Sequence, residues 1–151
     1  MHAFTAGFDR LLAVLAGLSM IAAFVAVTLG VVARLVGWDI PGLDAYAGYA
    51  IAAALFLALP QTLRRQEHIR VTLLLERCGP RLRSVLEWWS LAAGFVLAGY
   101  LAYYAARLVL VSREMHDISQ GADATPLWLP QIAMALGCAG FALSMLDALV
   151  S

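Results

Sequence analysis

The chain has 151 residues, of which 63% are hydrophobic and 13% are charged, and its mean hydropathy is +0.84. This composition excludes a small soluble domain with a water-facing surface. Ten basic and ten acidic residues give a formal net charge of zero, which excludes the strongly basic surface of a nucleic-acid-binding protein. We therefore expect a membrane protein that does not bind nucleic acid.

Four continuous apolar stretches predict transmembrane helices at residues 11–36, 44–63, 85–111 and 127–150. A bilayer core of roughly 30 Å requires about 20 helical residues. Backbone amides in lipid must find their hydrogen-bond partners within the helix, and the apolar runs do not alternate as those of a β-barrel would. The sequence thus predicts an all-α integral membrane protein, with residues 1–151 forming a single four-helix domain.

Charged residues near the ends of these spans have two explanations. Arg34 and Arg107 lie toward one face of the membrane, and Asp44 opens the second span. Their side chains can extend to water at the interface, which is the simpler explanation. The alternative is an ion pair between Asp44 and either arginine, which would hold neighbouring helices together.

The distribution of arginine predicts the orientation of the chain. The connection at residues 37–43 contains no basic residue, whereas the connection between the second and third spans contains six: Arg64, Arg65, Arg70, Arg77, Arg81 and Arg83. The positive-inside rule places this second connection in the cytoplasm, and both termini with it. Tryptophan side chains favour the headgroup level, so we expect interface anchors at the inner boundary (Trp88 and Trp89) and at the outer boundary (Trp38 and Trp128).

The connection at residues 64–84 predicts a short amphipathic segment in the headgroup plane. Its apolar residues 71–75 are flanked by charges, and Gly79-Pro80 ends the segment. Ser84 and Glu87 have the spacing of a capping box at the start of the third helix. Two interpretations stay open: a simple positive-inside anchor, or a surface that binds another membrane subunit and lipid phosphates.

The middle of each span lacks ionisable side chains, as judged around Phe24, Ala54, Ala98 and Cys138. A transport pathway formed by this chain alone would normally require such groups. The three histidines, His2, His68 and His116, all lie outside the predicted spans. We therefore expect no cofactor, no metal site and no enzymatic activity.

Small residues recur at four-residue spacing, which allows helix backbones to approach closely. Examples are Ala13 and Gly17 in the first span, Gly48 and Ala52 in the second, and Ala133 and Gly137 in the fourth. They predict tight helix packing, either within the chain or against a partner.

The region from Asp44 to Trp89 resembles the small, Q-type membrane subunit of tripartite ATP-independent periplasmic (TRAP) transporters. The resemblance rests on Arg65-Gln66-Glu67-His68-Ile69-Arg70-Val71, on Pro80-Arg81-Leu82-Arg83 and on Pro126-Leu127-Trp128-Leu129-Pro130. Thr72 stands where this family commonly has Asp, and Asp44 where it commonly has Glu. Because of these two departures, the resemblance does not imply a specific ion-pair role for Asp44 or Thr72.

The resemblance implies a function in partnership with other proteins. A periplasmic binding protein would deliver an organic acid to a large membrane subunit, which carries it inward with sodium across the bacterial inner membrane. The small subunit would brace the large one. Residues Asp44, Arg64, Arg65, His68, Arg70, Arg81 and Arg83 are the candidate contacts to partners or lipids.

Two other functions are alternatives. A stand-alone multidrug exporter would normally have a carboxylate in its first span, and residues 11–35 contain none. A membrane anchor for a respiratory enzyme would need histidines inside its spans to bind haem.

Overall fold

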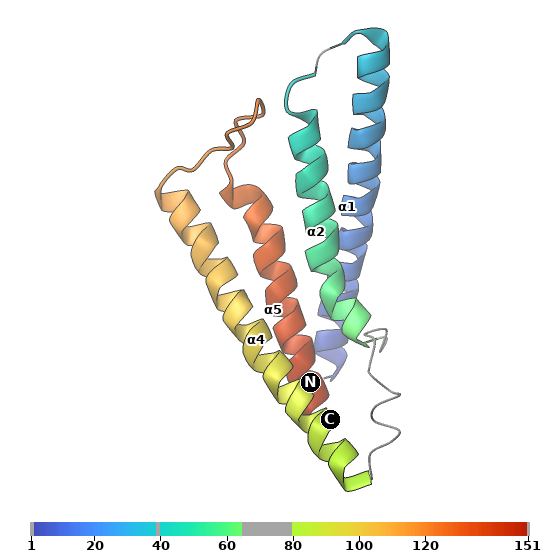
Figure 1. The fold of residues 1–151 in the computed structure, drawn as a ribbon, viewed down its shortest axis with the longest axis vertical. Coiled ribbons are helices and arrows are strands. Elements are labelled where there is room, and N and C mark those ends of the chain that lie inside the picture. The colour runs from blue at the N-terminus through green and yellow to red at the C-terminus, as the bar shows by residue number, and fades with distance from the viewer. Residues whose placement is uncertain (1, 39, 65–79, 151) are drawn as a thin grey trace.

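The computed structural model describes residues 2–38, 40–64 and 80–150, which form four long helices (Figure 1). Their bounds are α1 His2–Val36, α2 Leu43–Arg64, α4 Pro80–Glu114 and α5 Trp128–Val150. Each contains a segment long and apolar enough to cross a membrane: Gly7–Val36, Leu43–Leu63, Ser84–Glu114 and Trp128–Leu149. The prediction of an all-helical fold with four helices of this length and hydropathy is confirmed.

Two of the helices begin before the membrane spans that the sequence predicts. Helix α1 begins at His2 rather than near Leu11, and α4 begins at Pro80, so that Ser84 lies inside the helix and caps nothing. Proline suits the first helical position because it lacks the amide that would have no partner there. At about 1.5 Å per residue, the 35 residues of α1 or α4 extend about 52 Å, well beyond a roughly 30 Å hydrocarbon core. Hydropathy marks where the apolar segment begins, not where the helix begins.

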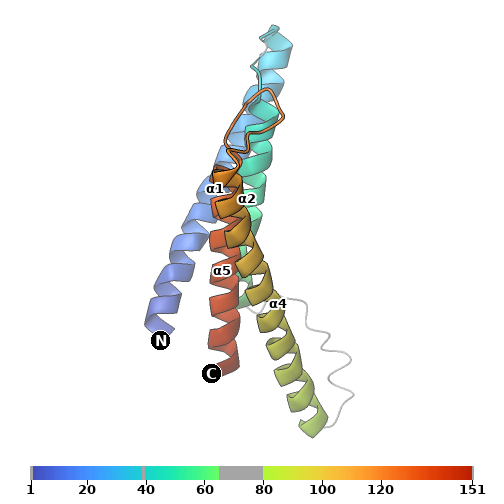
Figure 2. The same ribbon diagram turned by 90° about the vertical axis from the view of Figure 1, so that its left-hand side faces the viewer.

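The four helices form an open row in the order α1, α2, α5, α4. Helix α2 packs against α1 and α5, α4 packs mainly against α5, and α1 makes a smaller contact with α5. Figure 2 shows that α1 and α4 diverge at the end of the molecule where both termini lie. We call this the terminal end and the opposite one the loop end. The predicted amphipathic segment between α2 and α4 lies outside the described residues.

Helices α2 and α5 approach closely where a proline and a glycine face each other. Pro60, inside α2, has no amide to donate to the carbonyl of Phe56, four residues earlier. Gly137 of α5 lies against that carbonyl, and a Cβ at this position would collide with its oxygen. The missing side chain thus lets α5 approach a carbonyl that the α2 ladder leaves without a partner. Cα–H groups commonly contact carbonyl oxygens at such helix crossings.

A second glycine of α5 brings α1 into the same junction. At Gly140 a Cβ would come within 2.5 Å of Leu12 Cδ1 and 3.0 Å of Pro60 Cγ. Leu12, Ala16 and Leu57 form the buried core around it. The predicted small-residue packing therefore holds for Gly137, whereas a Cβ added at Gly17 or Gly48 would meet no neighbour within 4 Å.

Candidate functional site at the loop end

The α4–α5 loop, residues 115–127, is attached to α2 by its carboxylate Asp123. Oδ2 of Asp123 accepts a hydrogen bond from the Tyr49 hydroxyl at 3.0 Å, and Oδ1 accepts one from Ser119 Oγ at 2.8 Å. The backbone amide of Thr125 donates to the same carboxylate at 3.4 Å, while Thr125 Oγ1 donates to Tyr46 at 3.0 Å. Two tyrosines of one helix face thus hold the loop against α2.

Backbone contacts close the α4–α5 loop on itself. The amide of Ser119 donates to Thr125 O at 2.8 Å, and the amide of Leu127 donates to Asp117 O at 3.0 Å. Gly42, at the start of α2, lies directly under Asp123, because a Cβ there would come within 2.8 Å of the Asp123 Cα. Gly42 also has a φ of +82°, which favours glycine. The loop therefore contacts both α2 and Gly42, the residue that precedes α2.

The environment of Asp123 favours its ionised form. Partial burial alone would raise its pKa, but hydrogen bonds from Thr125, Ser119 and Tyr49 outweigh this and lower the pKa below its ordinary value. Three donors converge on one carboxylate, so the loop is best held when Asp123 is charged.

Asp44 forms the ion pair that the sequence left as the alternative. The Arg34 guanidinium lies 2.6 Å from the Asp44 carboxylate and joins the end of α1 to the start of α2. The two side chains are 72% and 83% exposed, so water screens the pair and its contribution to stability is at most about 1 kcal/mol. Arg107, the other candidate partner, makes no ion pair within the described residues.

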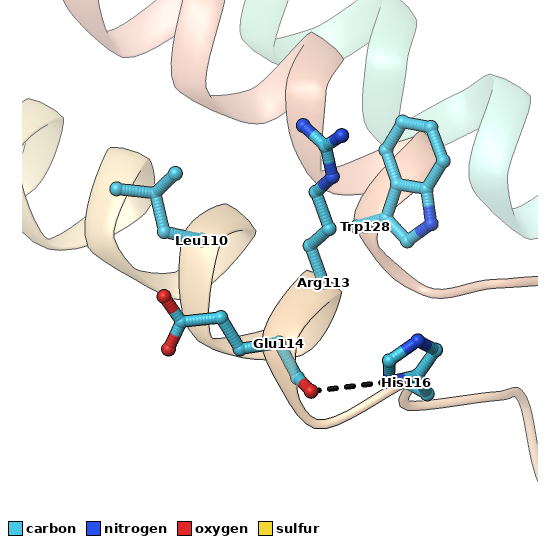
Figure 3. A pocket seen from close by; sticks show the side chains of 5 residues that line it. All are labelled: Leu110, Arg113, Glu114, His116 and Trp128. Atoms are coloured by element: carbon cyan, nitrogen blue, oxygen red, sulfur yellow. Dashed lines mark hydrogen bonds between the residues drawn. The ribbon is translucent and has the colours of Figure 1, made fainter.

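The end of α4 and the start of α5 border an open pocket of about 530 Å³ (Figure 3). It is lined by Leu110, Arg113, Glu114, His116 and Trp128. The Arg113 guanidinium lies 5.9 Å from the centre of the Trp128 ring, within cation–π range. Figure 3 shows the Glu114 carboxylate directed away from that guanidinium.

His116 is placed by the way in which α4 ends. It has a φ of +54°, and the amide of Asp117 donates to Ser112 O at 3.0 Å. This is a Schellman ending with a histidine where glycine is usual. His116 Nδ1 lies 3.1 Å from the Glu114 carbonyl oxygen and donates a hydrogen bond to it. The other ring nitrogen, Nε2, takes no part in this hydrogen bond.

The other predicted site residues divide into two groups. Trp88 and Trp89 on α4 are exposed, as is Trp38, two residues after the end of α1, and Trp128 at the start of α5 is half-buried. Exposure is what we expect of side chains that contact lipid. The side chains of the arginine-rich segment lie outside the described residues, so their predicted contacts stay predictions: Arg64, Arg65, His68, Arg70, Arg81 and Arg83.

A buried carboxylate at the terminal end escaped the sequence prediction. Asp9 of α1 is 2% exposed and accepts a hydrogen bond from Ser144 Oγ of α5 at 3.1 Å. Because the membrane segment of α1 begins at Gly7, this helix does contain a carboxylate, contrary to the expectation based on a start at Leu11. The sequence did contain a signal for this burial. Asp9 precedes Leu12 and Ala13 by three and four residues, so it lies on the same helix face as these apolar side chains.

Within the described part of the chain, no three His, Cys, Asp or Glu side chains cluster as a metal site would require. Searches of curated proteins and of solved structures found no match. A protein-family model does match: tripartite ATP-independent periplasmic transporters, DctQ component, over residues 23–151. That match covers most of the chain, including the helices that border the loop-end site. The chain therefore belongs to the DctQ family and is the small membrane component of a TRAP transporter rather than an enzyme.

Proposed function

We propose that this chain braces the large, sodium-coupled membrane subunit of its transporter during uptake of an organic acid delivered by a periplasmic binding protein. The match to the DctQ family carries this proposal, because a tripartite transporter implies DctM and periplasmic DctP partners. Substrate contacts would then lie in the other two chains. Residues 1–151 would act as one membrane domain in the bacterial inner membrane.

The arrangement of the helices supports a bracing role. An open row leaves broad apolar faces on its outer helices: Phe24 of α1 is 72% exposed, and Tyr100 and Tyr103 of α4 are each 63% exposed. A closed bundle would bury more of these side chains against one another. Lipid covers such faces in the isolated chain, and a larger membrane subunit can replace that lipid without exposing apolar surface to water.

The scarcity of ionisable groups midway along the helices also supports a role without substrate binding. Arg34 and Asp44 lie next to the ends of α1 and α2, and Asp9 lies near the start of the membrane segment Gly7–Val36. A carboxylate in α1 is the feature expected of a small exporter, but Asp9 is buried against Ser144 and directed into the protein. This buried hydrogen bond supports a structural contact between α1 and α5 at Asp9.

For orientation, we propose that the terminal end faces the cytoplasm. Figure 1 shows both termini at the end of the molecule where α2 ends and α4 begins. The two termini and the connection between α2 and α4 would therefore lie on the same side of the membrane. The six arginines between α2 and α4 favour the cytoplasm for this side. The loop-end site would then face the periplasm, where a binding protein arrives.

Labelling in intact cells tests the orientation. A membrane-impermeant maleimide is expected to modify Gln120→Cys, since Gln120 is an exposed loop residue, and to spare the native Cys78 until the membrane is opened. Labelling of Cys78 in intact cells would reverse the orientation.

Reconstitution tests the bracing role. The chain is co-expressed with its DctM component, purified in mild detergent and reconstituted in vesicles with the DctP component. A sodium gradient should drive uptake of labelled organic acids only when all three components are present. Vesicles with this chain alone should take up neither sodium nor organic acid. Uptake by this chain alone, or full uptake by DctM and DctP without it, would contradict the proposal.

A further inference from the structure

The pocket between the end of α4 and the start of α5 combines a cation, a ring and apolar surface at the membrane boundary. Arg113 is next to last in the membrane segment Ser84–Glu114, and Trp128 is first in the segment Trp128–Leu149. Leu110, one turn deeper than Arg113, is 59% exposed. The pocket therefore spans the depth at which acyl chains give way to headgroups.

Arg113 has no carboxylate partner among the described residues. Its guanidinium carbon lies 5.9 Å from the centre of the Trp128 ring, while the neighbouring Glu114 carboxylate points away from it in Figure 3. A guanidinium held against an indole ring keeps its hydrogen-bond donors available in a fixed plane, a geometry that suits phosphate oxygens. His116 lines the same pocket and uses only Nδ1 in its contact with the Glu114 carbonyl.

We propose that this pocket binds the phosphodiester of a membrane phospholipid from the leaflet at the loop end. Arg113 contacts the phosphate oxygens, His116 lies beside the headgroup, and Leu110 with the Trp128 ring contacts the glycerol and upper acyl chain. The volume of about 530 Å³ falls within the roughly 300–1,000 Å³ of small-molecule sites. A soluble phosphate would contact Arg113 in the same way but would leave the apolar part of the pocket unfilled.

Arg113 must supply the attraction for an anion at this site, because the C-terminal end of α4 repels one. The last carbonyls of α4 carry partial negative charge, and Glu114 adds a full one, so both disfavour an anion here. Only Arg113 among the described lining residues carries a permanent positive charge. Its removal should therefore abolish most of the preference for a phosphate-bearing lipid.

Native mass spectrometry of the purified, delipidated full-length chain tests this proposal. The chain is titrated with dioleoyl phosphatidylglycerol and with dioleoylglycerol, which has the same acyl chains and no phosphate. Arg113→Gln should lower the apparent affinity for the phospholipid about tenfold, as the loss of a charge-assisted contact predicts. Binding of dioleoylglycerol should not change.

Arg107→Gln is the matched control, since Arg107 is an exposed arginine of the same helix that does not line the pocket. It should leave phospholipid binding unchanged, and circular dichroism should show equal helix content in both variants. An equal loss of phospholipid affinity in the two variants would show that the effect depends only on the net charge of the protein. That result would overturn the proposal. Full competition by glycerol 1-phosphate at the concentration of the lipid would identify a soluble phosphate instead, and would also overturn it.

Discussion

The hydroxyl of Tyr49 donates a hydrogen bond to the carboxylate of Asp123, which lies 74 residues later in the chain, at 3.0 Å. This bond connects α2 to the loop that precedes the last helix. With the neighbouring bond from Thr125 to Tyr46, it determines where the α4–α5 loop lies on the loop-end surface. Any partner that approaches this end meets a loop held by α2.

Removal of the Tyr49 hydroxyl should loosen the α4–α5 loop. Tyr49→Phe keeps the ring but loses one donor to Asp123, at a cost of about 1 kcal/mol for a partly buried hydrogen bond. Hydrogen exchange of the Ser119 amide, which bonds Thr125 O, should become roughly fivefold faster. Tyr103→Phe, on the exposed face of α4, is the control. Equal exchange in both variants would show that this hydrogen bond does not hold the loop.

The stability that Asp123 contributes should depend on pH in one direction. Its pKa is lower in the folded loop than its ordinary value of 3.8, so the folded form binds its proton less tightly than the unfolded form does. The contribution is complete above the ordinary pKa and is lost as the pH falls through the lowered one. The unfolding temperatures of the wild type and Asp123→Asn in detergent should differ at pH 7, begin to converge as the pH falls below about 3.8, and meet only below the lowered pKa. A difference that grows with acidification would refute this assignment.

A methyl group at position 137 should disturb the crossing of α2 and α5. In Gly137→Ala the new Cβ would collide with the backbone carbonyl of Phe56, so that α2 and α5 would have to move apart. We expect a loss of about 1–3 kcal/mol, typical of overpacking, measured as a lower unfolding temperature in detergent.

Gly99→Ala provides the comparison, because position 99 lies inside α4 with no neighbour within 4 Å. There, alanine should be neutral or stabilise the helix by up to about 1 kcal/mol. Equal unfolding temperatures for the two variants would place the close approach of α2 and α5 in doubt.

The arginine-rich segment should affect assembly if it contacts the large subunit. The paired change Arg65→Lys with Arg70→Lys keeps the positive charge but loses the bidentate geometry of the guanidinium. We expect this pair, or His68→Ala, to reduce co-purification with the DctM component and to reduce uptake several-fold, while membrane insertion is unchanged. Arg10→Lys, an exposed arginine of α1 at the terminal end, is the control. If complex yield and uptake are both unchanged, the segment does not contribute to assembly, and its arginines serve only to orient the chain in the membrane.

The number and kind of the helices could be predicted from the sequence because lipid leaves the backbone few choices. An apolar run of about 20 residues must form a helix whatever surrounds it, so the four spans were recognisable without tertiary information. The helix starts were less predictable. Helix α1 extends back to His2 and α4 to Pro80, since the headgroup region tolerates polar residues in a helix that is already nucleated in the apolar segment.

The contacts between helices depend on how the helices cross, which local patterns do not encode. Asp9 and Ser144 are 135 residues apart, and neither the charge of one nor the hydroxyl of the other indicates its partner. Gly137 was one of several small residues at similar spacing, and the structure shows that it is the one that lies against the Phe56 carbonyl of α2. Asp123 likewise became the centre of the loop end once α2 placed two tyrosines beneath it. Hydrophobicity acts on each segment separately, whereas close packing and directional hydrogen bonds act between segments, and only the assembled structure brings their partners within reach.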